Sequence, residues 1–195
     1  MNRIHLKTLF IWALAFAALA PAQMARAEQY AQLMSRMLAQ GDAQHLFQPA
    51  IEKRLFDMVN AYRRSHGANI LADDPAMKGA ARAHAADMAL HNFLGHVASS
   101  GHDFDSRMHA LRPGVMVLPT MAENAAGMHR PSSAEFVAQQ LFSAWLASAP
   151  HLHTLLSRDY LKVATGVTII DDRAYADQIF TGPQAETNMN SGGGN

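Results

Sequence analysis

The sequence predicts an α+β domain in which several helices come first and paired strands come last. Apolar residues recur every three or four positions through most of the chain, which is the period of helices with one buried face. Two β-rich runs, LKVATGVTII and AYADQIFTG, then flank DDR and predict a hairpin. Hydrophobic residues make up 49% of the 195 residues, enough for one sizeable core. Helices packed on an antiparallel sheet satisfy this order of elements.

The first 27 residues have the features of a secretory signal peptide. Arg3 and Lys7 precede the apolar run LFIWALAFAALA, and small residues at Ala25 and Ala27 suit signal peptidase. We predict cleavage after Ala27; the alternative is an uncleaved N-terminal anchor. Cleavage removes Arg3, Lys7 and Arg26 but none of the 16 acidic residues, so the mature chain is mildly acidic. We expect no stable membrane span in it.

The composition limits the classes of function. There is no cysteine, so disulfides and thiol chemistry are excluded and the stability must come from the core. The formal charge of the whole chain is zero, and no basic run resembles a nucleic-acid footprint. An exported chain without cysteine suits the bacterial periplasm or the exterior of a bacterium.

The first predicted helix of the mature chain spans residues 28–41. It has one apolar face, formed by Tyr30, Leu33, Met34, Met37 and Leu38. This face either packs on the chain's own domain or contacts a partner. An apolar stripe on a helix usually faces its own core, which favours the first interpretation.

Three further helices are predicted over residues 48–67, 75–92 and 103–111. Asp74 and Pro75 suit the start of the second of these, as its cap and its first-turn residue. Many alanines in this helix allow another layer to come close. Its inner face is formed by Met77, Ala81, His84 and Met88.

One more helix is predicted before the hairpin. The apolar run at residues 115–119 is typical of a short strand. Ser132 and Glu135 then have the spacing of a capping box, and Pro150 ends the helix that follows. The inner face of that helix repeats at Val137, Leu141 and Trp145.

Three polar residues sit at the edges of apolar elements and could act together: His96, Glu123 and His151. Two imidazoles and a carboxylate are ligands that zinc binds, and three such ligands leave a fourth position open. The same groups also suit acid–base chemistry. The three residues lie far apart in a chain with eleven histidines. Spacing alone therefore also allows three separate polar residues with no shared task.

Seven short segments stand in an order that is typical of one family: LFDMVNAYRRSHG, MKGAARAHAADMA, NFLGHVASSG, MAENAAG, FSAWLASAPHLHTLL, ATGVTI and YADQIF. Together they resemble the CAP superfamily of cysteine-rich secretory proteins, antigen 5 and pathogenesis-related proteins, also called SCP-like, and in particular its cysteine-free bacterial branch. The resemblance implies an α-β-α sandwich with a central antiparallel sheet between helical layers. The resemblance covers residues 48–183, which we predict to be the CAP domain. The signal peptide at residues 1–27 and a helical extension at residues 28–47 precede it, and residues 184–195, which have the composition of a linker, are expected to form a disordered tail.

The resemblance further implies a cavity lined by His96, Glu123 and His151. Many family members have a second glutamate there, and its position in this chain is Ser148. A mechanism that needs two acids therefore lacks one of them. His84 lies on the inner face of its helix and belongs either to the core or to the cavity wall.

Other matched positions are expected to serve the architecture. Asn60 would tie the first helix of the domain to neighbouring backbone. Arg107 would hold a loop through its guanidinium group. Gln178 and Phe180 match the last strand, and Trp145 is expected to pack in the core.

Three functions are compatible with these residues. The first is a binding protein whose groove takes a small ligand, lipid, glycan, peptide or cell-envelope component. In it His96, Glu123 and His151 either hold zinc or another divalent cation or brace the groove. The resemblance supports it, because family members have been associated with lipid and metal binding and no common reaction unites them. The second is a metal-assisted hydrolase acting on peptide or cell-wall material, in which a zinc-bound water would be the nucleophile. The third is an interaction module that uses the helix at residues 28–41.

Overall fold

The computed structural model describes residues 5–115 and 117–183, with side chains described from residue 24 onward. The predicted tail at residues 184–195 lies outside the described residues. Within the described part of the chain, no helix combines the length and the apolar character that crossing a bilayer would require.

A four-stranded sheet forms the middle of the molecule, in the order β1-β3-β4-β2. The strands are β1 (Ala72–Asp73), β2 (Met121–His129), β3 (Lys162–Ile170) and β4 (Arg173–Thr181). β3 and β4 form the predicted hairpin, with Ile170 opposite Arg173, and β2 pairs antiparallel with β4. The short β1 pairs parallel with β3. This strand was not predicted, because two residues are too few to show a periodic pattern.

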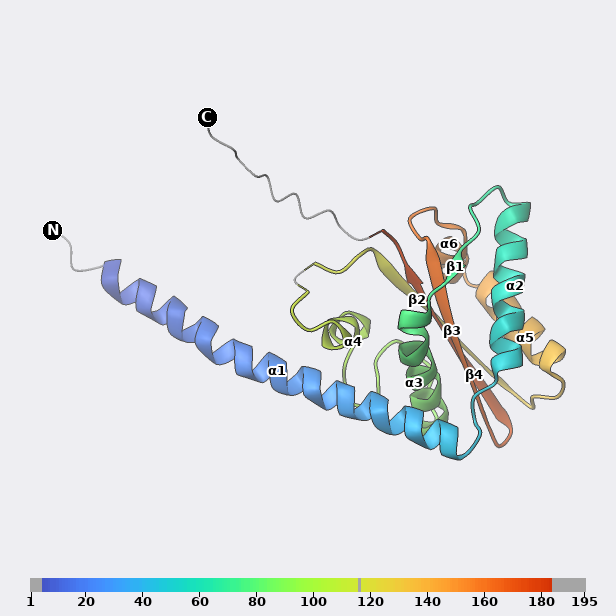
Figure 1. Ribbon diagram of the computed structural model, residues 1–195, viewed down its shortest axis with the longest axis horizontal. Helices are drawn as coiled ribbons and strands as arrows, with labels where there is room; N and C mark the ends of the chain where they lie inside the picture. The colour runs from blue at the N-terminus through green and yellow to red at the C-terminus, as the bar shows by residue number, and fades with distance from the viewer. Residues whose placement is uncertain (1–4, 116, 184–195) are drawn as a thin grey trace.

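Helices cover both faces of the sheet, as Figure 1 shows. On one face lie α2 (Pro49–Ser65), α5 (Ala134–Ala147) and α6 (Ala149–Leu156). On the other face α3 (Pro75–His91) contacts β3 and β4, and α1 (His5–Ala43) and α4 (Phe104–Leu111) pack outside it. This three-layer arrangement confirms the α-β-α sandwich.

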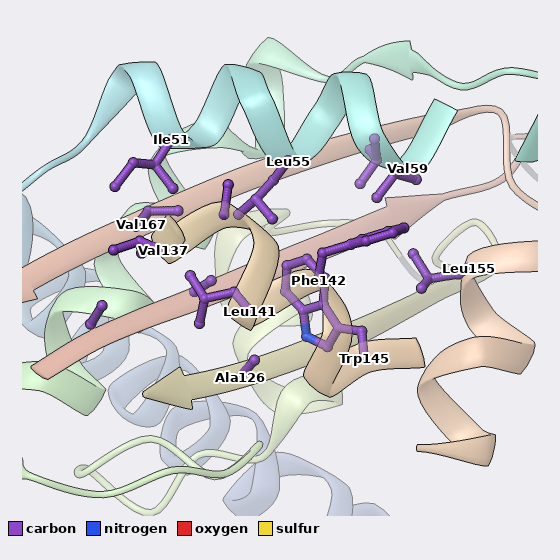
Figure 2. Close-up of a cluster of buried hydrophobic side chains, with 14 of the residues drawn as sticks. Ile51, Leu55, Val59, Ala126, Val137, Leu141, Phe142, Trp145, Leu155 and Val167 are labelled. Atoms are coloured by element: carbon purple, nitrogen blue, oxygen red, sulfur yellow. The ribbon is translucent and has the colours of Figure 1, made fainter. Parts of the chain in front are cut away.

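The larger hydrophobic core lies between the sheet and the layer formed by α2, α5 and α6 (Figure 2). Trp145 of α5 is fully buried in it. Successive turns of α2 and α5 reach the same core because their apolar residues recur every three or four positions. Its labelled members include Ile51, Leu55, Val59, Val137, Leu141 and Val167.

The other face of the sheet holds α3 unusually close. A Cβ atom added at Gly166 of β3 would come within 2.3 Å of the backbone nitrogen of Arg82 and 2.4 Å of the carbonyl carbon of Ala81. The alanines of α3 and this glycine together allow the two backbones to approach. The predicted inner face of the helix is buried, at Met77, Ala81, His84 and Met88.

The helix α1 continues through the predicted cleavage site after Ala27. Tyr30, Leu33 and Met37 are buried in a cluster with alanines of α3, so the chain's own domain covers this face. The backbone carbonyl of Arg26 accepts a hydrogen bond from His102 Nε2 at 3.0 Å. Signal cleavage stays a prediction.

Three local predictions were wrong. Residues 115 and 117–119 form no strand; β2 begins at Met121, because Pro119 has no N–H to give to a ladder. The cap of α5 is Ser133 rather than Ser132, since the Ser133 hydroxyl accepts from Phe136 N. Pro150 does not end α5; it stands in the first turn of α6, where its missing N–H leaves no bond unmade.

Candidate functional site

Different elements bring the candidate residues to one place. His96 lies in the loop between α3 and α4, which starts where Asn92 ends α3 in a left-handed conformation, with φ of 55°. Glu123 lies on β2, His151 lies in the first turn of α6, and Arg107 projects from α4. Residues far apart in the sequence therefore meet beside β2.

A chain of contacts runs from the buried Arg107 to the half-exposed His96. Glu123 Oε1 lies 2.7 Å from His96 Nδ1, and Glu123 Oε2 accepts from Arg107 Nη2. The same Arg107 nitrogen donates to the backbone carbonyl of His96 at 3.0 Å. The side chain of Glu123 is 2% exposed, that of Arg107 is 0% exposed, and that of His96 is 50% exposed. The buried Glu123 and Arg107 thus fix the position of the His96 imidazole at the surface.

The charges in this chain of contacts reinforce one another. Burial disfavours ionisation of Glu123, but the hydrogen bond to His96 and the charge of Arg107 outweigh it and hold the pKa of the carboxyl below its ordinary value. The hydrogen bond to Glu123 raises the pKa of His96, although partial burial opposes it. The pair therefore favours the charged forms of both groups, the carboxylate of Glu123 and the imidazolium of His96.

His151 completes the exposed part of the site. Its ring lies edge-on to that of His96, with centroids 6.2 Å apart and an interplanar angle of 66°. Burial and the nearby His96 lower the pKa of His151, so the neutral imidazole is favoured. Asn124 Nδ2 on β2 donates to the His151 backbone carbonyl at 3.1 Å, which ties α6 to the sheet. A neutral imidazole has one donor and one acceptor nitrogen, so His151 can give and take a hydrogen bond.

Two further ionisable residues lie beneath the site. His84 Nε2 is 2.8 Å from the backbone carbonyl of Gly95 and 3.9 Å from Glu123 Oε1, so His84 forms the buried wall. Asp177 on β4 is fully buried, and neither carboxyl oxygen has a hydrogen-bond partner among the described residues. Burial and the charge of Glu123 raise the pKa of Asp177 well above its ordinary value.

Sequence reasoning missed Asp177, although one signal was present. It is an acidic residue among apolar ones in a strand, on the same side as Ile179. Glu123 pairs with Ile179 and Ala125 pairs with Asp177, which puts both carboxyls on the face beneath α3. The acidic residue in an apolar strand was visible in the sequence, but the pairing register of β2 with β4 was not.

Residues expected to serve the architecture make the following contacts. Asn60 bonds both backbone groups of Leu71, donating to its carbonyl at 2.9 Å and accepting from its N–H at 2.7 Å. Gln178 donates to the Thr165 hydroxyl at 3.0 Å, and both side chains are buried. Ser148, at the position of the missing second acid, is the residue at which α5 ends and α6 begins.

The donor set bears on the predicted metal site. Among the described residues, no group of three or more His, Cys, Asp or Glu side chains is arranged to hold a metal ion. The rings of His96 and His151 are neighbours, but Glu123 is already bonded to Arg107 and His96. A cation at Glu123 would have to displace or oppose the guanidinium charge, so the residues as placed do not fit a three-ligand centre. The metal prediction stays a prediction.

The fold and this His/Glu site define an α-β-α sandwich domain with a polar site beside β2, and comparison with known proteins makes the assignment. The model of the cysteine-rich secretory protein family (CAP) matches residues 56–182. The chain therefore belongs to the CAP family, as the resemblance indicated, and it does so without any cysteine.

Individual relatives agree with this assignment. The chain is 30% identical over 135 residues to a Bacillus subtilis (strain 168) protein named "Uncharacterized membrane protein YlbC", covering 68% of this chain and 35% of that protein. It thus spans about a third of the length of that relative. An extracellular SCP-domain protein from Bacillus anthracis superposes with a TM-score of 0.56 at 24% identity, over 70% of this chain and 41% of the other.

An outer surface protein from Borrelia burgdorferi also superposes with a TM-score of 0.56, at 18% identity. The superposition covers 69% of this chain and 93% of that protein. At these identities the two structures show a shared fold.

Proposed function

We propose that this protein is an exported CAP-domain protein that binds a small amphipathic ligand at the site formed by His96, Glu123 and His151. The observation that carries the proposal is the half-exposed His96 imidazole, fixed at 2.7 Å from a carboxylate that is almost fully buried. Burying Glu123 and Arg107 requires both charged groups to be desolvated, and a loop can be held in place without this free-energy cost. A buried ion pair that fixes the exposed His96 imidazole is therefore typical of a pre-arranged binding site.

The surroundings of His96 suggest the chemistry of the ligand. Leu94 and Val97, on either side of His96, are 56% and 52% exposed. Exposed apolar side chains beside a pre-arranged polar pair suit a molecule with a polar head and an apolar body. Because the hydrogen bond to Glu123 raises the pKa of His96, an anionic head such as a carboxylate is favoured. A fatty acid has both parts.

Export supports the same function. The signal-peptide features of residues 1–27 predict it, and two proteins of the same fold are described as an extracellular protein and an outer surface protein. We therefore place the mature protein in the periplasm or outside the cell. Ligands available there include lipids and cell-envelope components.

Calorimetry with dodecanoate as the probe tests this proposal. We expect the purified protein to bind dodecanoate, and expect His96→Ala and His151→Ala to weaken binding at least tenfold, a change of about 1.4 kcal/mol. His153→Ala is the matched control, because His153 is an exposed residue of the same helix as His151. Dodecanol, which lacks the charge, should bind more weakly than dodecanoate. Equal binding by all four proteins would refute the assigned site.

The alternative, a metal-assisted hydrolase, can be tested separately. It needs zinc held by His96 and His151 and a Glu123 freed from Arg107. Zinc titration of the wild type and of a His96→Ala/His151→Ala double variant distinguishes the two functions. Zinc binding that is lost in a still-folded double variant would support the hydrolase and justify a substrate screen. Equal zinc binding by both proteins, or by neither, would remove it.

A further inference from the structure

A cavity lies at the opposite edge of the sheet from Glu123. It has a volume of about 330 Å³ and lies between α2 and α3, with Thr165 of β3 among its lining residues. This volume is at the lower end of the range for ligand pockets. Two strands, β3 and β4, separate this cavity from β2, so it is distinct from the His96 site.

The outer edge of β3 is covered at both of its ends. At one end Ala72 N donates to Leu161 O and Asp74 N donates to Val163 O. At the other end, the segment before α2 bonds the edge through Gln48 N to Val167 O and Ile169 N to Leu46 O. The chain thus protects most of an edge that would otherwise attract other strands.

Thr165 lies in the gap between these two covered stretches. Residues 163, 167 and 169 all direct backbone groups to this edge, and in an antiparallel pair alternate residues do so. The N–H and C=O of Thr165 therefore point the same way. No described residue hydrogen bonds either of them, although Thr165 is only 2% exposed. Buried backbone groups of this kind normally have partners.

The side chain of Glu52 hydrogen bonds to the outer edge of β3 although Glu52 is not part of the sheet. Its Oε1 accepts from Val167 N at 3.3 Å and from Arg82 Nε at 2.8 Å. A carboxylate of α2 thus takes the place of a strand carbonyl at the next outward-facing residue along the edge. Arg82 holds Glu52 through both carboxylate oxygens, so this wall of the cavity is fixed.

We propose that the cavity binds a short peptide in an extended conformation, one residue of which pairs with Thr165 as an added antiparallel strand. The paired residue would donate its N–H to the Thr165 carbonyl and accept from the Thr165 N–H. The covered stretches on both sides limit the pairing to about one residue. This proposal does not depend on the ligand of the His96 site.

The charged side chains at the rim of the cavity indicate which residue types should flank the paired residue of the peptide. Lys53 and Asp57 form an exposed ion pair at 2.6 Å, and Lys78 and Asp73 form another at 3.3 Å. Exposed pairs of this kind contribute little in water, so their members can re-pair with ligand charges. Phe56 adds an apolar surface to the lining. A peptide with an apolar central residue and flanking charges of both signs fits this rim.

Nuclear magnetic resonance of the ¹⁵N-labelled protein tests the proposal, with acetyl-Lys-Val-Asp-amide as the probe. We expect the peptide to shift the Thr165 amide signal and to slow its hydrogen exchange, while the Val167 amide, already bonded to Glu52, keeps its exchange rate. The same peptide with N-methylvaline lacks the donor for the Thr165 carbonyl and should bind roughly tenfold more weakly. Lys78→Ala should weaken binding several-fold, and Lys162→Ala, an exposed lysine at the start of β3, should not.

Three results would overturn the proposal. One is an unchanged Thr165 amide at about 10 mM peptide, well above the range of weak specific binding. Another is equal binding of the N-methylated peptide, which would exclude backbone pairing. The third is a set of shifts confined to the loop around His96, which would make the peptide a ligand of the first site.

Discussion

Arg107→Met is the substitution that should reveal how much the fold depends on the buried part of the His96 site. The side chains of Arg107 and Glu123 are 0% and 2% exposed, and Arg107 also holds the carbonyl of His96. Methionine keeps much of the volume but leaves Glu123 buried without its cation. Breaking a buried pair from one side costs about 3–5 kcal/mol. With a urea m-value of about 2 kcal/mol/M, the unfolding midpoint should fall by about 2 M.

The matched control is Arg54→Met. Arg54 also makes two bonds to a glutamate, Glu135, at 2.7 and 2.8 Å, but both side chains are nearly half exposed. An exposed pair contributes about 0–1 kcal/mol, so the midpoint should move by less than about 0.5 M. Urea unfolding followed by circular dichroism measures both variants. Equal midpoints for the two variants would refute the reasoning that Arg107 and Glu123 act as a buried pair.

Two further predictions concern the pH dependence and the packing of α3. The hydrogen bond to Glu123 raises the pKa of His96 in the folded protein. The His96–Glu123 interaction therefore stabilises the fold fully below the ordinary histidine pKa, and this stabilisation is lost as the pH rises through the raised pKa of His96. Wild type should therefore exceed His96→Gln in stability by more at about pH 5.5 than at about pH 8.5, and a constant difference in urea midpoints would contradict this. Gly166→Ala should cost about 1–3 kcal/mol or more, because its Cβ would meet the backbone of α3. Gly95→Ala, with open space around it, should stay within about 0.5 kcal/mol in the same melts, and equal losses would contradict the close approach.

Much of the fold could be predicted because its elements have strong local patterns. The helix α2 has an apolar face of regular spacing, and the hairpin has two β-rich runs around a short polar turn. The small strand β1 could not be predicted, since two residues carry no periodicity. The start of β2 was missed because the apolar run before it is stronger than the strand itself, which has a polar pair at Glu123 and Asn124.

The site was less accessible to sequence reasoning. The family resemblance brought His96, Glu123 and His151 together, and spacing alone did not. Arg107 was expected to hold a loop, but its bond to Glu123 depends on where the tertiary fold places α4 relative to β2. Contacts of this kind follow from tertiary packing, which leaves no periodic trace in the sequence.

The most direct test of the central claim is to follow the imidazole signals of His96 and His151 in one titration. In a protein labelled with ¹⁵N at histidine, dodecanoate should shift both rings along the same saturation curve, because they form one site with centroids 6.2 Å apart. The His153 ring should not move. If His96 and His151 saturate at different concentrations, or if neither ring responds while dodecanoate binds elsewhere, the two histidines do not form the binding site.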